Sequence, residues 1–100
     1  MITQWREHLE RALRRKRSYQ ATFLNKEGDP HSPAADVLAD LAKFCRAHRT
    51  TAVFSSIRGV FDPYASARAD GRREVWLRIQ SHLRLNDRQL ERIQDHAESE

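Results

Sequence analysis

The side chains best suited to chemistry are scattered along this sequence. Five histidines are present, no two of them share a helical turn, and neither an HExxH motif nor a second cysteine accompanies them. A zinc site or a similar transition-metal site needs three or four such ligands brought together. We therefore expect no metal site and no cofactor. The histidines are His8, His31, His48, His82 and His96.

The sequence supports nucleophilic catalysis no better than it supports a metal site. Ser81 and His82 are neighbours, and consecutive residues of a helix point about 100 degrees apart, so this pair does not form a nucleophile with its base. Cys45 is the single cysteine, which excludes an intramolecular disulfide. It lies on the apolar face of a predicted helix, where burial raises the pKa of a thiol and makes it unreactive. With three glycines there is also no phosphate-cradling loop, and we expect a protein that is not an enzyme.

Nucleic-acid binding is an alternative function, because the net charge of +4 is concentrated near the start of the chain. Residues 1–26 hold seven basic and two acidic side chains, whereas residues 68–100 hold seven of each. Fifteen of the eighteen bases are arginine. The basic run is Arg14-Arg15-Lys16-Arg17, but four consecutive helical residues point all round the axis, so at most two share a face. For Arg14, Arg15 and Arg17 we favour a solvated or partner-facing patch.

Residues 79–93 have the apolar spacing of a helix-turn-helix motif, whose second helix enters the major groove of DNA. Residues 86–100 carry a net charge of −3, which phosphates would repel. Arg84 also stands where the turn usually has a glycine. The pattern therefore favours two helices joined by a capped turn over a DNA-binding motif.

The elements that position these residues are predicted to be helices. Apolar periodicity and capping signals predict four of them, at about 3–24, 33–48, 63–84 and 87–97. Ser32-Pro33 and Asp62-Pro63 each place a favoured N-cap before a proline at the first helical position. Asn86 and Gln89 have the spacing of a capping box. We expect an all-α fold, a small bundle in a single domain over 1–100, with an acidic last helix over 86–100.

The predicted core follows the apolar faces of these helices. In the first helix Trp5, Leu9 and Leu13 recur every four residues. Near residues 16–18, in the basic part of this helix, we expect either a bend or a break. For Trp5 and Trp76 core packing is favoured, with a partly exposed anchor for another protein as the alternative. Gly71 lies mid-helix and predicts the close approach of another backbone. The other predicted core positions are Ala34, Val37, Leu38, Leu41, Phe44, Cys45, His48, Val75, Ile79 and Leu83.

Residues 50–61 give the least clear signal. Thr51–Phe54 and Ile57–Phe61 have the composition of a small hairpin or of an apolar loop lying across the helices, and we favour the loop. Charged residues interrupt every window long enough for a signal peptide or a membrane span, so we expect neither.

Three groups of residues form a pattern over the middle of the chain. They are Tyr19…Phe23…Gly28, then Val37-Leu38-Ala39-Asp40-Leu41…Phe44, then Asp62…Ala67…Gly71-Arg72-Arg73…Val75…Ile79…Leu83. This pattern resembles the Bbp-like phage domain, a small family named after a Bordetella phage gene product. The resemblance covers residues 18–85. Residues 29–35 look like an insertion, and both the basic segment 1–17 and the acidic last helix are less typical.

The resemblance implies a small tailed-phage protein with no catalytic residues, made in the host cytoplasm and located in the virion. It implies binding to portal or head–tail components, or to internal proteins ejected with the DNA, in several copies that form a ring or another homo-oligomer. Arg72 or Arg73 of its Gly-x-Arg element would bridge a carboxylate in the fold or on a partner, and we favour the bridge within the fold. A phage inhibitor of a host enzyme stays open as an alternative. The candidate partner-binding residues are Trp5, Arg14, Arg15, Arg17, Arg72, Arg73 and Trp76.

Overall fold

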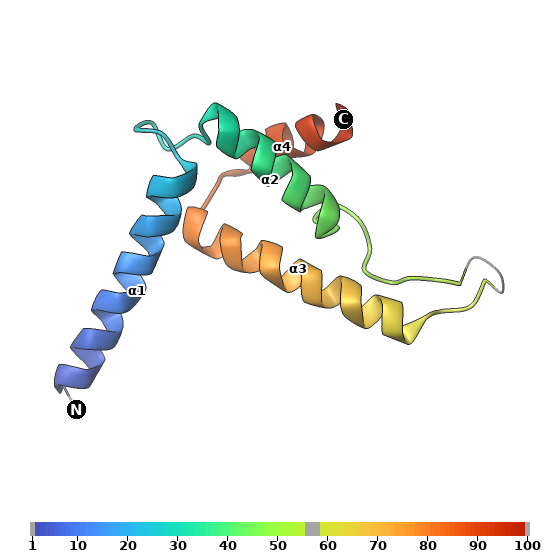
Figure 1. Cartoon of the computed structure of the whole chain (residues 1–100), viewed down its shortest axis with the longest axis horizontal. Coiled ribbons are helices and arrows are strands. Elements are labelled where there is room, and N and C mark those ends of the chain that lie inside the picture. Colours follow the sequence, from blue (N-terminus) through green and yellow to red (C-terminus); the bar gives the residue numbers. More distant parts are fainter. Residues whose placement is uncertain (1, 56–58, 100) are drawn as a thin grey trace.

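The computed structural model describes residues 2–55 and 59–99, and helices are the regular elements of this part of the chain (Figure 1). They are α1 (Ile2–Phe23), α2 (Ser32–Phe44), α3 (Pro63–Leu83) and α4 (Asp87–Ser99). Over these residues the chain forms four helices and no strand, which confirms the predicted all-α class. The ends of α1, α3 and α4 lie within two residues of their predicted positions.

The core lies where α2, α3 and α4 meet. α2 packs along α4, and the C-terminal part of α1 packs against the C-terminal part of α3 (Figure 1). Trp76 is only 4% exposed, so the core position predicted for this tryptophan is confirmed. The buried side chains of this cluster are Leu38, Ala42, Cys45, Trp76, Ile79, Leu83 and Ile93.

Two of the three predicted helix caps are confirmed. The Asp62 carboxylate accepts hydrogen bonds from the backbone N–H groups of Tyr64 and Ala65 at the start of α3. Asn86 and Gln89 exchange reciprocal side-chain to backbone bonds of 2.9 Å each. Both arrangements satisfy N–H groups that the first helical turn leaves without a partner.

The cap predicted for α2 was wrong, because His31 takes the place expected for Ser32. His31 Nδ1 accepts a hydrogen bond from the Ala34 N–H at 3.2 Å. The other ring nitrogen, Nε2, lies 2.7 Å from the carbonyl of Thr22 in α1. Only the neutral ring with its hydrogen on Nε2 makes both bonds. The cap therefore also ties α2 to α1.

α2 ends at Phe44, four residues before its predicted end at 48. Arg46 adopts a left-handed backbone conformation with φ 54°. The N–H of Arg46 donates to the Lys43 carbonyl, and the N–H of Ala47 donates to the Ala42 carbonyl. This pair of bonds is the Schellman motif, which normally has glycine at the left-handed position. Because arginine stands there, the usual stop signal was missing from the sequence.

The segment between α2 and α3 forms no strand within its described residues, and 56–58 of the predicted hairpin lie outside them. Phe54 and Phe61 form an isolated antiparallel bridge with their rings edge to face, 5.9 Å between centroids. The N–H groups of Ser55 and Asp62 also donate to the carbonyls of Val60 and Val53. The segment is thus a loop whose two limbs pair at this bridge, as the hairpin alternative expected, and its predicted course across the helices was wrong. It extends past the N-terminal end of α3 (Figure 1), anchored there because the Val53 N–H donates to Ser66 Oγ.

α1 is a single continuous helix, without the predicted alternatives of a bend or break near residues 16–18. Its residues 2–15, called the α1 arm below, are all exposed and point away from the other helices (Figure 1). The radius of gyration is 16.9 Å, whereas a compact chain of this length has about 13 Å. The arm and the segment between α2 and α3, which project at opposite ends of the molecule (Figure 1), together make it extended.

Candidate partner-binding surfaces

The α1 arm presents an apolar stripe to solvent. Trp5 is 69% exposed, Leu9 42% and Leu13 41%, so the core position predicted for these three residues was wrong. The periodicity did identify a helix, but α3 covers only the end of α1. There the Tyr19 ring stacks on His82 with centroids 4.4 Å apart, and the Phe23 side chain packs against the core.

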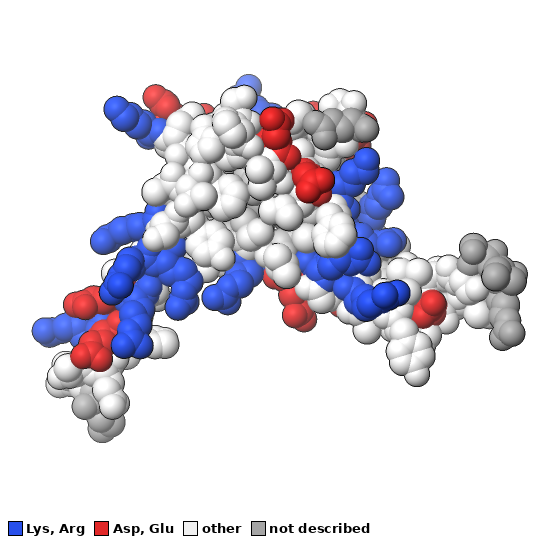
Figure 2. Space-filling model, viewed as in Figure 1, with Lys and Arg blue, Asp and Glu red and all other residues white. Residues whose placement is uncertain are grey.

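Arginine side chains surround the stripe on the same helix. Arg14, Arg15 and Arg17 are exposed, and Figure 2 shows Lys and Arg side chains clustered along α1. Across residues 2–55 and 59–99 the one ion pair is formed by His96 and Asp36, at 2.7 Å. The charges of the α1 arm are therefore not neutralised by ion pairs within the described chain. The role predicted for the three arginines, contact with a partner, stays a prediction.

A second exposed apolar surface lies between α2 and α3 and is called the α2–α3 patch. It consists of Phe44, Arg68, Gly71, Arg72 and Val75. Phe44 is 59% exposed, so the core positions predicted for Phe44, Val37 and Val75 were wrong. Figure 2 shows uncharged side chains over much of α2 and Lys or Arg side chains where the end of α2 lies beside α3. The apolar face of α2 is wider than the area that its neighbours cover.

Gly71 does not mark the close approach of another backbone, so that prediction was wrong. A methyl group built on Gly71 would meet no atom within 4 Å. The glycine lines an open depression together with Phe44, Arg68, Arg72 and Val75. Its missing side chain leaves room on the surface, and this room is a feature of the α2–α3 patch.

Arg72 and Arg73 make different contacts, and within residues 2–55 and 59–99 neither bridges a carboxylate, so the bridge predicted inside the fold was wrong. A bridge to a carboxylate of a partner stays a prediction. The Arg72 guanidinium lies over the Phe44 ring, 5.0 Å from its centre. Arg73 Nη1 donates to the carbonyl oxygens of Arg46 and Arg49, at 2.8 Å each. Arg72 thus holds an aromatic side chain at the surface, and Arg73 fixes the segment that follows α2. Arg73 and the buried Trp76 are structural residues in this chain.

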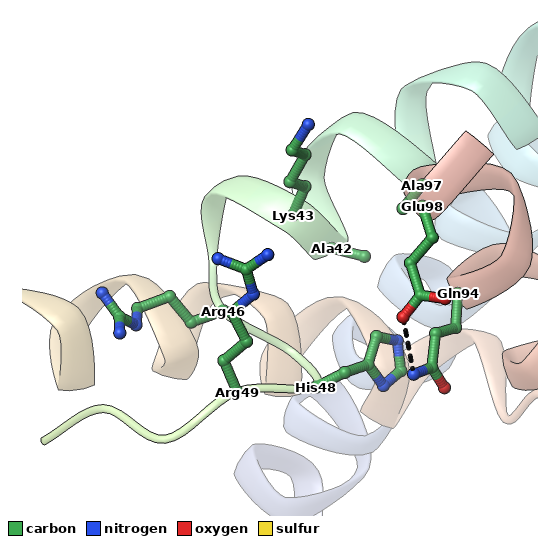
Figure 3. A pocket seen from close by; sticks show the side chains of 8 residues that line it. All are labelled: Ala42, Lys43, Arg46, His48, Arg49, Gln94, Ala97 and Glu98. Carbon is green, nitrogen blue, oxygen red and sulfur yellow. Dashed lines mark hydrogen bonds between the residues drawn. The ribbon is translucent and has the colours of Figure 1, made fainter. Parts of the chain in front are cut away.

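A further pocket of about 230 Å³ opens between the end of α2 and the end of α4 (Figure 3). Its basic side chains do not converge, since Lys43 and Arg46 point away from each other and Arg46 Nε donates to the Thr50 carbonyl. Glu98 accepts a hydrogen bond from Gln94 at 3.2 Å. The volume is below the roughly 300 Å³ at which ligand pockets begin. The two apolar surfaces are therefore the stronger candidates.

The single cysteine lies in the core rather than at either surface. Burial raises the pKa of the Cys45 thiol, and the nearby Arg72 acts more weakly in the opposite direction. A thiol in this state is a poor nucleophile. Among the described residues no group of three or more histidine, cysteine or carboxylate side chains has the arrangement of a metal site.

A comparison with known protein families identifies the family of the chain. The family model of the Bbp19-like phage protein matches residues 19–95. The chain belongs to the Bbp19-like phage protein family. The match confirms the resemblance seen in the sequence, and it extends beyond the predicted limit at residue 85 into α4. It begins at Tyr19, where α1 starts to contact α3, so the α1 arm precedes the matched segment.

No curated protein and no solved structure matches the chain. None of the helices in 2–55 and 59–99 has the length and apolar content needed to cross a membrane. We therefore infer the role of this Bbp19-like phage protein from its own surfaces.

Proposed function

We propose that this phage protein is a non-enzymatic structural component of the virion, which binds a portal or head–tail protein through the α2–α3 patch. One observation carries the proposal. Phe44 and Val75 are large apolar side chains held at the surface around an open depression. Aromatic side chains and arginine are enriched at protein interfaces, where a few anchors supply most of the binding energy.

The patch is arranged in advance for such a contact. Arg72 lies over the Phe44 ring, which limits the positions of both side chains before a partner arrives. Side chains that are already ordered lose less conformational entropy on binding. The room beside Gly71 accepts a side chain of the partner.

Mass spectrometry of purified virions tests the proposal. Wild-type protein is expected in the particles in a fixed number of copies, and the Phe44→Glu variant is expected to be lost from them. Leu77→Glu is the matched control, because Leu77 is 56% exposed on α3 but lies outside the patch. Its incorporation should stay at the wild-type level.

Two results would contradict the proposal. Absence of the wild-type protein from virions would favour the alternative of an inhibitor that acts on a host enzyme. Equal incorporation of Phe44→Glu and wild type would exclude the patch as the binding surface. Circular dichroism of the purified variants should show that both keep the helical fold.

Nucleic-acid binding is a second candidate, supported by one observation on the α1 arm. Arg11, Arg14 and Arg15 are exposed on the side of the helix opposite the apolar stripe. Phosphate contacts give an affinity that falls steeply as salt rises. Titration of labelled duplex DNA at several salt concentrations measures this slope. Absence of binding at low salt would eliminate this candidate.

A further inference from the structure

The apolar stripe of the α1 arm continues a face of α1 that is already used for packing. Tyr19 and Phe23 follow the stripe on the same side of the helix and contact α3 and the core. Ile2, Trp5 and Leu9 extend this side toward the N-terminus, where no other helix of the chain lies beside it (Figure 1). The packing surface of α1 is therefore longer than the surface that its own chain provides.

An isolated helix of this length is only marginally stable in water. The described part of the arm has fourteen residues, 2–15, and none of them is buried. In addition, no acidic residue stands in its first turn to stabilise the helix dipole. A covering partner therefore stabilises the helix of the α1 arm.

We propose that this partner is the α1 arm of a second copy, in an antiparallel pair centred on Leu9. The stripe is self-complementary in that register. The two Leu9 side chains face each other at the two-fold axis. Trp5 lies four residues before Leu9 and Leu13 four residues after it, so each Trp5 packs against Leu13 of the second copy. The same surface serves both copies, as two-fold symmetry requires.

The charges of the arm select the antiparallel direction. Residues 2–10 hold Arg6, Glu7 and Glu10, a net charge of −1, whereas residues 11–17 hold five basic side chains and no acidic one. A parallel pair would bring the two basic runs together. An antiparallel pair in this register sets each basic run beside residues 2–7 of the other copy, where the charges of Arg6 and Glu7 cancel. It also places Lys16 and Arg17, the bases of the run nearest the stripe, at opposite ends of the pair and so avoids this repulsion.

The shape of the molecule permits the pairing. The arm points away from the body formed by α2, α3 and α4 (Figure 1). The sixteen residues 2–17 span about 24 Å at 1.5 Å per residue. In an antiparallel pair the two bodies then lie at opposite ends of this overlap. The α2–α3 patch stays exposed on each copy, so the pairing does not depend on the proposed function.

Sedimentation equilibrium of the full chain tests the pairing. Wild-type protein is expected at twice the 11.7 kDa of one chain, and Leu9→Glu at the mass of one chain, because two carboxylates would meet at the axis. Leu77→Glu is the control, since it adds the same charge to another exposed leucine, and should remain a dimer. A monomeric wild type, or dissociation of both variants alike, would overturn the proposal.

Disulfide cross-linking tests the direction and the register. In a Cys45→Ala background, Leu9→Cys is expected to form a disulfide between copies on mild oxidation, because the two positions meet at the axis. Ile2→Cys is expected to remain reduced, because the two copies of this residue lie at opposite ends of the pair. Equal cross-linking at both positions would show a parallel pair and contradict the proposed geometry. Virion incorporation of Phe44→Glu tests the other proposal separately.

Discussion

Arg73 shows how one side chain can hold two helices in place. Its guanidinium, on α3, donates to two carbonyl oxygens in the segment after α2. These carbonyls belong to Arg46, which has the left-handed backbone conformation, and to Arg49. A charged donor offsets part of the cost of that conformation and fixes the end of α2 against α3.

We expect Arg73→Ala to lower the free energy of unfolding by about 1–2 kcal/mol, because a charged donor to two carbonyls is lost at a half-buried position. Urea unfolding followed by circular dichroism measures this change. Arg78→Ala is the matched control on α3, where Arg78 is exposed, and its effect should stay within about 0.5 kcal/mol. Equal effects of the two substitutions would show that the carbonyl contacts do not stabilise the fold.

At the scale of the elements, the helix caps that could be predicted from the sequence are those whose side chains bond only to near neighbours in the chain. Asp62 and the Asn86–Gln89 pair were predictable, because their side chains bond to N–H groups two or three residues away. His31 was not, since histidine is an uncommon cap and its second bond goes to Thr22 in another helix. Helix starts were thus predicted well, and the one error depends on a tertiary contact.

His31→Ala is expected to lower the free energy of unfolding by about 1–2 kcal/mol, because the α2 cap and the bond to the Thr22 carbonyl are both lost. Ser32→Ala is expected to change it by less than about 0.5 kcal/mol, because Ser32 is exposed and is not the cap. Thermal or urea unfolding distinguishes the two. A larger loss of stability in Ser32→Ala than in His31→Ala would show that Ser32 is the cap of α2, as the sequence predicted.

Both α2 and α3 end at an arginine in the left-handed conformation. At the end of α3, Arg84 has φ 53°, a conformation that costs a residue with a side chain about 1–2 kcal/mol. We expect Arg84→Gly to raise the free energy of unfolding by about 0.5–1 kcal/mol, after the larger chain entropy of glycine in the unfolded state is subtracted.

Arg78→Gly, in the interior of the same helix, is the control for this substitution. It is expected to lower the free energy of unfolding by about 1 kcal/mol, because glycine is a poor helix former. Urea unfolding of both variants gives the comparison. A loss of stability in Arg84→Gly as large as that in Arg78→Gly would show that the left-handed backbone at residue 84 carries no strain.

At the scale of the whole molecule, the extended shape follows from the α1 arm and from the segment between α2 and α3 at the opposite end (Figure 1). The longest dimension is 55 Å and the shortest is 19 Å. The arm and the α2–α3 patch lie on different helices, so one surface can join copies while the other binds a different protein. An architecture with separate surfaces suits a component of a larger assembly.

Small-angle X-ray scattering of the monomeric Leu9→Glu variant is expected to give a radius of gyration near the 16.9 Å of the structure, because nothing in the chain covers the arm. A value near 13 Å would mean that the arm folds back onto the body. Wild-type protein should give a larger value that rises with concentration, as the extended pair forms.

The sequence by itself determined the helices and most of their first residues, because periodicity and capping act over a few neighbouring positions. It also determined the family, through the residues from Tyr19 onward. Only the tertiary structure decided which apolar residues are covered. Trp5 and Trp76 both lie beside an apolar stripe, yet Trp5 is 69% exposed and Trp76 is 4% exposed. Periodicity reports which side of a helix is apolar, whereas burial depends on how far the neighbouring helices extend along that side.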